Sequence, residues 1–257
     1  MSSTIDKTLD LSISNYGTAR RQQYDIALLP WGATEPHNLH LPYLTDAILS
    51  HDVAVDAAAM ARDLYGIRAM VLPAMPLGAQ NPGQRELPFC IHYRQETQRA
   101  VIADIVASLY HQGLRRMLII NGHGGNTFKG IIRDLAVDYP DMLIGSGEWF
   151  KGANAKDYFD HPGDHADELE TSAMMYYHPE LVNLDEAGHG GDGGFKGEML
   201  SRGVAWIPRD WSRISPDTGI GDPYGASAEK GARFVRACAE AFAKVINEMC
   251  QPNLYQD

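Results

Sequence analysis

Residues 24–46 of the 257-residue chain read YDIALLPWGATEPHNLHLPYLTD, and this stretch decides the fold. Its first part, residues 24–31, is a short apolar run that ends at a glycine-containing turn, which is typical of a buried strand. Residues 68–77 and 116–121 repeat the pattern, and residues 142–146 are a fourth candidate. The sequence therefore predicts four buried strands.

Helical patterns alternate with these apolar runs. They lie at residues 46–64, around 101–109, at 127–139 before Pro140, and around 235–249. Alternating strands and helices joined by right-handed crossovers give a parallel sheet with helices on both faces. We therefore expect an α/β fold, a three-layer αβα sandwich with a mainly parallel four-stranded sheet, in one domain (1–257). Residues 186–225 show no regular pattern and are predicted to be a loop or lid.

Composition argues against several classes of protein. No apolar run approaches the roughly 18 residues that a bilayer-spanning helix needs, so we expect no membrane partner. The formal net charge is -11 and the 22 Lys and Arg residues form no dense cluster, so nucleic acid is not expected to bind. The three cysteines are too few for a disulfide framework, and the first residues do not resemble a secretory signal. We therefore expect a cytoplasmic protein.

Metal-capable side chains gather in three segments that follow or border predicted strands. The loop at 32–46 carries Glu35, His37, His40 and Asp46. The second segment is NGHGGN at 121–126, which holds His123, and the third is HADELETS at 165–172. Because the carboxyl ends of parallel strands meet at one edge of an open α/β sheet, these segments are predicted to form a single site there.

The ligand chemistry indicates a divalent cation. Imidazoles and carboxylates without thiolates suit Zn²⁺, Mn²⁺ or Fe²⁺, and one carboxylate can bridge two cations with its two oxygens. Each segment by itself has a structural explanation: Glu35 and His37 could belong to a surface loop, and His123 could cap a helix. The placement of all three segments at strand ends favours the metal site.

The third segment offers more than one carboxylate. On a helix, residues three apart share a face and residues two apart do not, so His165 and Glu168 could face the site together. We therefore predict Glu168 as a metal ligand and His165 as a nearby proton carrier. Glu170 is expected to face solvent or to orient a ligating histidine, and it is the alternative to Glu168 as the fifth ligand. Trp149 follows the fourth predicted strand and is expected either to line the substrate pocket or to lie in the core.

At these three segments the sequence resembles the creatininase (creatinine amidohydrolase) family, from Leu28 to about residue 185. The shared pattern is Gly-x-x-Glu-x-His with a following Leu-Pro and Thr-Asp, then Asn-Gly-His-Gly-Gly-Asn, then a histidine-containing segment ending Glu-Thr-Ser. The resemblance implies a four-stranded parallel αβα fold, a homohexamer, and two divalent cations per subunit, commonly Zn²⁺ with Mn²⁺ or Fe²⁺ in some members. By motif position, Glu35 and His123 would hold one cation, His37 and Glu168 the other, and Asp46 would bridge them.

The chain also departs from the family pattern. Creatininase itself carries a ligating Glu where Gly125 stands here, so the missing carboxylate is expected from elsewhere, and the substrate is expected to differ from creatinine. The resemblance implies a metal-dependent hydrolase that attacks a carbonyl of a small cyclic substrate with hydroxide, most simply a cyclic amide (C–N hydrolysis). The alternatives are C–C hydrolysis of a cyclic 1,3-diketone of the 3-dehydro-scyllo-inosose type and a metal-binding structural protein without turnover.

Overall fold

The computed structural model describes residues 6–255 and is built around one parallel sheet. Its strands are β1 (Ile26–Trp31), β2 (Ala69–Val71), β3 (Arg116–Asn121) and β4 (Leu143–Glu148). They pair in the order β2-β1-β3-β4, and every pairing is parallel. The predicted four-stranded parallel sheet is confirmed.

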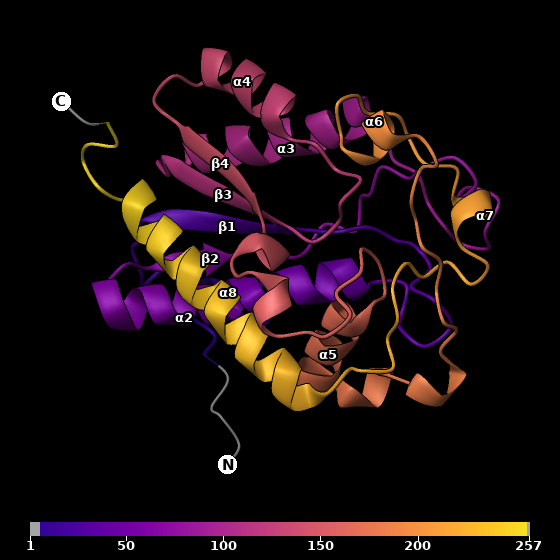
Figure 1. Ribbon diagram of the computed structural model, residues 1–257. Helices are drawn as coiled ribbons and strands as arrows, with labels where there is room; N and C mark the ends of the chain where they lie inside the picture. The colour runs from indigo at the N-terminus through magenta and orange to yellow at the C-terminus, as the bar shows by residue number, and fades with distance from the viewer. Residues whose placement is uncertain (1–5, 256–257) are drawn as a thin grey trace.

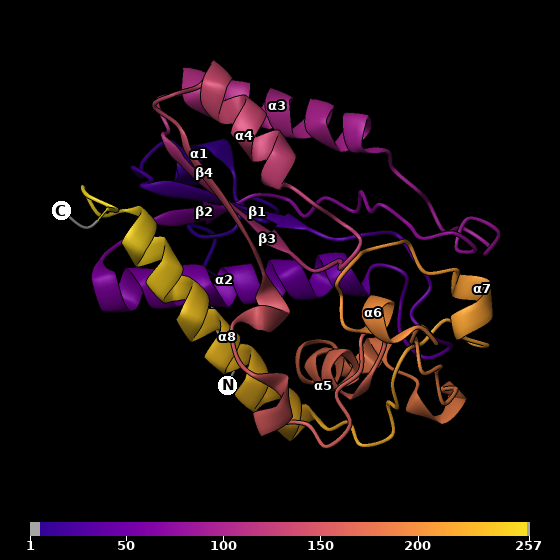
Figure 2. The ribbon, with the colours of Figure 1, turned by 45° about the horizontal axis from the view of Figure 1, so that its top comes forward.

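Helices cover both faces of the sheet (Figures 1 and 2). One layer is formed by α2 (Thr45–Tyr65), α5 (Glu168–Tyr177) and α8 (Ala228–Met249), and the other by α3 (Gln95–His111) and α4 (Lys129–Asp138). Side chains of β1 alternate between the two apolar cores, since Leu28 packs with the first layer and Leu29 with the second. β1 and the inner part of β3 read as apolar runs because both of their faces are buried, whereas β4, at the edge of the sheet, is partly exposed.

The other elements are short. They are α1 (Tyr16–Ala19), α6 (Glu198–Ser201), α7 (Trp211–Ile214) and the 3₁₀ turns Trp149–Lys151, Ala155–Asp157, Pro179–Leu181 and Leu184–Glu186. Within the described part of the chain, no helix is both long and apolar enough to span a membrane.

The second strand is shorter than predicted. Residues 68–77 contain Pro73 and Pro76, which have no backbone N–H for the ladder, so the regular strand ends at Val71. Beyond that point the segment stays beside β1 through single backbone hydrogen bonds and an isolated bridge between Met75 and Trp31.

Residues 186–225 contain only short helices, as the sequence predicted, but they are anchored to the site. The Asn38 side chain accepts from the Gly188 N–H and donates to the Gly188 carbonyl, both at 2.9 Å. Ile220 forms isolated bridges with His165 and Gly191. The predicted lid is therefore joined at several points to the residues that build the site.

Two glycines bring the strand ends against the first turn of α2. A Cβ on Gly32 would lie 2.3 Å from the Ala47 nitrogen, and one on Gly122 would lie 2.4 Å from the Asp46 carbonyl oxygen. Only glycine permits such close backbone approach without a shift. The ends of β1 and β3 thereby meet around Asp46.

Candidate metal centre

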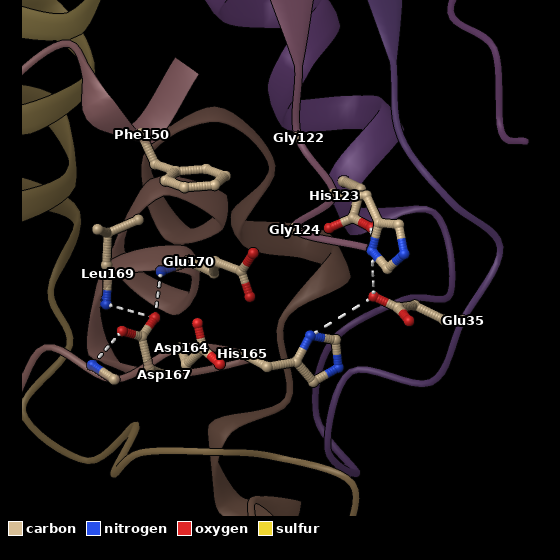
Figure 3. A pocket seen from close by; sticks show the side chains of 12 residues that line it. Glu35, Gly122, His123, Gly124, Phe150, Asp164, His165, Asp167, Leu169 and Glu170 are labelled. Atoms are coloured by element: carbon tan, nitrogen blue, oxygen red, sulfur yellow. Dashed lines mark hydrogen bonds and ion pairs between the residues drawn. The ribbon is translucent and has the colours of Figure 1, made fainter. Parts of the chain in front are cut away.

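Six side chains converge at the carboxyl ends of β1 and β3, and each residue is at most 9% exposed. They are Glu35, His37, Asp46, His123, His165 and Glu170. Figure 3 shows Glu35, His123 and His165 on one side of the cavity and Glu170 facing them from α5. The sequence prediction that the three segments form one site is consistent with this geometry.

Two groups of three side chains share Asp46. In the first, His123 Nδ1 lies 3.0 Å from Glu35 Oε1 and 3.2 Å from Asp46 Oδ2. In the second, His37 Nε2 lies 3.1 Å from Asp46 Oδ1 and 4.0 Å from Glu170 Oε2. Within each group, one ligand atom per residue lies within 4.8 Å of the others. Each group could hold one cation, with Asp46 between them.

Backbone carbonyls set the orientation of the three imidazoles. The contacts are His37 Nδ1 to the Glu35 carbonyl at 3.0 Å, His123 Nε2 to the Ala79 carbonyl at 2.9 Å, and His165 Nε2 to the Pro36 carbonyl at 2.8 Å. A carbonyl only accepts, so each of these nitrogens carries the proton. The other ring nitrogen faces the carboxylates, where it can offer its lone pair to a cation once the ring is neutral.

The charges of the group are balanced by protons when no cation is present. Burial disfavours a charge on His37, but Asp46 and Glu170 outweigh it and raise the pKa of that imidazole to about 10. Burial likewise opposes the charge on His123, and Glu35 and Asp46 raise its pKa well above the usual range. Burial raises the pKa of Glu170 to about 8, with His37 opposing.

The donor set fits divalent cations. Three buried carboxylates face three imidazoles with no thiolate, which suits Zn²⁺, Mn²⁺ or Fe²⁺. Asp46 Oδ2 is buried, and His123 Nδ1 at 3.2 Å is the one polar side-chain atom that the described residues place beside it, so this oxygen is free to contact a cation that takes the place of the His123 proton. Cations bound here would take over the role of the protons on His37 and His123.

The structure corrects the prediction for Glu168. Its carboxylate is fully buried and turned away from the six side chains, where it accepts from Lys230 Nζ at 2.5 Å and from the His161 N–H at 2.7 Å. Glu170 occupies the place beside His37 and Asp46 instead. We therefore replace Glu168 by Glu170 in the proposed ligand set, and Glu168 has no catalytic contact in the cavity.

The prediction failed because His165 lies outside the helix. His165 sits on an isolated bridge to Ile220, and α5 begins only at Glu168, after Asp167 caps it by accepting from the Leu169 and Glu170 N–H groups. The three-residue spacing between His165 and Glu168 therefore says nothing about a shared helix face. Asp167 followed three residues later by Glu170 is a capping pattern that could have located this start.

Of the two places expected for Trp149, the structure shows the core and corrects the prediction of a pocket wall. Trp149 is fully buried in the core, where its ring packs edge-on against Phe150 and Phe234. Phe150 takes its place as the aromatic wall of the cavity, which Figure 3 shows above Glu170. His165 does line the cavity, with Nδ1 at 3.5 Å from Glu35 Oε1.

His40 lies outside both groups of three. Its Nε2 lies 2.8 Å from Thr171 Oγ1, which ties the loop after β1 to α5. Burial lowers the pKa of His40 to about 4, with His37 adding to the effect, so this imidazole is neutral.

A family model described as creatinine amidohydrolase matches residues 10–246, more than nine-tenths of the chain. The chain belongs to the creatininase family.

Three relatives carry the names of different hydrolases. They are a creatinine amidohydrolase from Pseudomonas putida (24% identical, 88% of this chain and 90% of the relative), a 3-dehydro-scyllo-inosose hydrolase from Thermotoga maritima (23%, 90% and 80%) and a mycofactocin precursor peptide peptidase from Mycobacterium ulcerans (28%, 80% and 78%). The chain is thus a hydrolase of a family whose members act on several substrates.

Solved structures show the same fold. A Bacteroides fragilis protein provisionally named a creatinine amidohydrolase aligns with a TM-score of 0.95 at 55% identity, covering 98% of this chain and 100% of that one. A manganese form of creatininase aligns with a TM-score of 0.78 at 21% identity, covering 95% and 100%. A mutant creatininase of Zn–Zn type aligns similarly, with a TM-score of 0.77 at 21% identity and coverage of 95% and 98%.

Gly125 cannot supply a ligand in this member of the creatininase family. A Cβ at this position would lie 2.2 Å from the Ala79 carbonyl oxygen and 2.5 Å from His123 Nε2. The hydrogen bond between His123 and Ala79 therefore takes the space that a side chain at residue 125 would need. Glu170 is the carboxylate that completes the second group.

Proposed function

We propose that this chain hydrolyses an amide C–N bond in a small substrate at a two-cation centre. The observation that carries the proposal is the pair of three-residue groups that share Asp46. Glu35 and His123 would hold one cation, and His37 and Glu170 would hold the other. Asp46 would contribute to both. Bound there, divalent cations lower the pKa of a water molecule and polarise a carbonyl. Zn²⁺ is the first candidate, and Mn²⁺ or Fe²⁺ the next.

His165 is the proposed proton carrier. Burial lowers the pKa of its imidazole, and His37 adds to the effect, so the ring is neutral near pH 7. Its Nε2–H is engaged by the Pro36 carbonyl, which leaves Nδ1 as the basic atom at the cavity wall. That nitrogen can accept a proton from the attacking water and return it to the leaving nitrogen.

The cavity favours a small uncharged substrate. Its volume is ≈ 100 Å³, and Phe150 and Leu169 give it an apolar side. Among the described residues that line it, none is Lys or Arg, whereas Asp164 adds a further carboxylate. An anionic group would have only the proposed cations to pair with, so the rest of the substrate is expected to be neutral, as in a ring or an amide.

The names of the relatives favour hydrolysis of an amide C–N bond over hydrolysis of a C–C bond in a cyclic 1,3-diketone. Creatinine amidohydrolase and a peptide peptidase are both named for cleaving C–N bonds, and the inosose hydrolase is the third relative. C–C hydrolysis of a cyclic 1,3-diketone is the second candidate because it also begins with attack on a polarised carbonyl.

A substrate panel separates these candidates. The protein is loaded separately with Zn²⁺, Mn²⁺ and Fe²⁺, incubated with lactams, cyclic ureas, formamides, short peptides and cyclic diketones, and the products are weighed by mass spectrometry. We expect addition of one water to an amide or cyclic amide. Hydrolysis confined to diketones would overturn the amide assignment, and no product from any compound would favour the structural alternative.

Cation binding should release protons at neutral pH. The pKa values of His37, His123 and Glu170 are all raised in the cation-free protein, so these groups carry protons that cations must displace. The cation-free state holds more protons than the loaded state, so affinity should weaken as the pH falls. Calorimetric titrations at one pH in buffers of different ionisation enthalpy measure the release. Heats that do not depend on the buffer would contradict the expectation.

Assembly and location are also proposals. We propose a homohexamer in the cytoplasm, the first from the resemblance to the family and the second supported by Cys90, Cys238 and Cys250, which are all free. Native mass spectrometry of the purified protein tests the hexamer, and a monomer at micromolar concentration would contradict it.

A further inference from the structure

Gln84 is a buried amide whose orientation is fixed by the backbone. It is 1% exposed and lies in the loop between β2 and α3. The Asn81 N–H donates to Gln84 Oε1 at 2.6 Å, and because an N–H cannot accept, the oxygen of the amide must point toward Asn81. The nitrogen, Nε2, therefore points the other way and donates to Glu35 Oε2 at 2.8 Å.

The two oxygens of Glu35 thus have different partners. Oε1 faces His123 Nδ1 at 3.0 Å, inside the group formed by Glu35, Asp46 and His123, and it also lies 3.5 Å from His165 Nδ1. Oε2 is held by Gln84 outside that group. A hydrogen bond from a neutral donor to a buried carboxylate is strong and directional, so it fixes which oxygen Glu35 presents.

The loop that carries Gln84 is itself anchored. The Trp211 N–H donates to the Pro82 carbonyl at 2.8 Å, and the Trp211 ring nitrogen donates to the Thr218 carbonyl at 2.9 Å. Gln84 therefore approaches Glu35 from a turn that is hydrogen-bonded to the first residue of α7.

We propose that Gln84 is a positioning residue that holds Glu35 for the cation bound with His123, and that it acts on this half of the centre alone. The inference rests on the proposed two-cation centre. Glu170, in the other half, has a different support, because its Oε2 accepts from the Ala166 N–H at 2.6 Å in its own segment. Loss of the Gln84 donor should therefore weaken binding of the cation held with His123 and leave the affinity for the other cation unchanged.

The test compares the two halves separately. Gln84→Met keeps the length of the side chain and removes the donor. It is introduced into a Glu170→Gln variant, which retains the group of Glu35, Asp46 and His123. It is also introduced into a His123→Ala variant, which retains the group of His37, Asp46 and Glu170. Zn²⁺ is titrated into each protein by calorimetry. We expect about 10- to 100-fold weaker binding in the first background, as is usual when the partner of a ligand is lost, and unchanged binding in the second.

Control variants keep the test decisive. Gln80→Met removes an amide from the same loop whose nitrogen and oxygen have no partner among the described residues, and it should leave both affinities unchanged. Gln84→Glu keeps the length and the acceptor for Asn81 but opposes Glu35 with a second carboxylate. It should therefore weaken Zn²⁺ binding at the same half of the centre, and it replaces Gln84→Met in the test if that variant does not fold.

Equal affinities in the Glu170→Gln background with and without Gln84→Met would overturn the role of Gln84. A wild-type protein that binds no Zn²⁺ would overturn the centre itself.

Discussion

Replacing His123 by alanine should remove the cation held with Glu35 and reduce kcat by about 10³-fold, because a cation contributes several kcal/mol to carbonyl attack and each 1.36 kcal/mol is tenfold in rate. His123 offers its Nδ1 to Glu35 and Asp46 from the sharp turn after β3, where its neighbours Gly122 and Gly124 have no side chain to replace it. Metal content by plasma mass spectrometry and turnover on the substrate found in the panel measure both effects.

A matched control for this variant is His111→Ala. His111 is exposed at the end of α3 and lies outside the six side chains of the centre, so its loss should leave metal content and kcat unchanged. If His123→Ala retained turnover in metal-free buffer, the metal-dependent reaction would be excluded.

Glu170→Gln and Glu168→Gln should have opposite effects, although the two residues are only two positions apart. Glu170→Gln removes the carboxylate beside His37 and Asp46, so we expect loss of one cation and of turnover with the fold retained. Glu168→Gln leaves Lys230 without its buried partner and should destabilise the protein by roughly 1–3 kcal/mol, less than a fully buried pair because Lys230 is 26% exposed. Its metal content should stay unchanged.

Thermal unfolding and metal analysis on the same two preparations separate these outcomes. Loss of metal from Glu168→Gln together with full metal content in Glu170→Gln would restore the ligand set expected from the sequence alone.

The sheet and four of the side chains at the centre could be predicted because they depend on local patterns. Glu35, His37 and His123 follow apolar strands, and parallel strands bring their carboxyl ends to one edge whatever the details of the loops. Asp46 opens the helix that follows the first strand, and so it is carried to the same place.

The identity of the fifth ligand, a carboxylate, depended on the rotational phase of one helix. Asp167 caps α5, so Glu168 turns toward Lys230 on α8 and Glu170 turns toward His37. The capping pattern was readable in the sequence, but the pairing with Lys230, 62 residues away, was not.

Trp149 and Gln84 could not be assigned from the sequence for a similar reason. A tryptophan after a strand can face a pocket or the core, and the choice here follows from the packing of Phe234 on α8 against it. Gln84 lies in a loop without regular structure and meets Glu35 across 49 residues of chain. Contacts of this kind are set by tertiary packing and leave no local pattern.

The measurement that tests the two-cation centre most directly is a crystal structure of the loaded protein with anomalous diffraction recorded at the absorption edge of the bound metal. We predict two peaks, one among Glu35, Asp46 and His123 and one among His37, Asp46 and Glu170, with Asp46 contacting both. A single peak, or a peak in contact with Glu168, would contradict this arrangement.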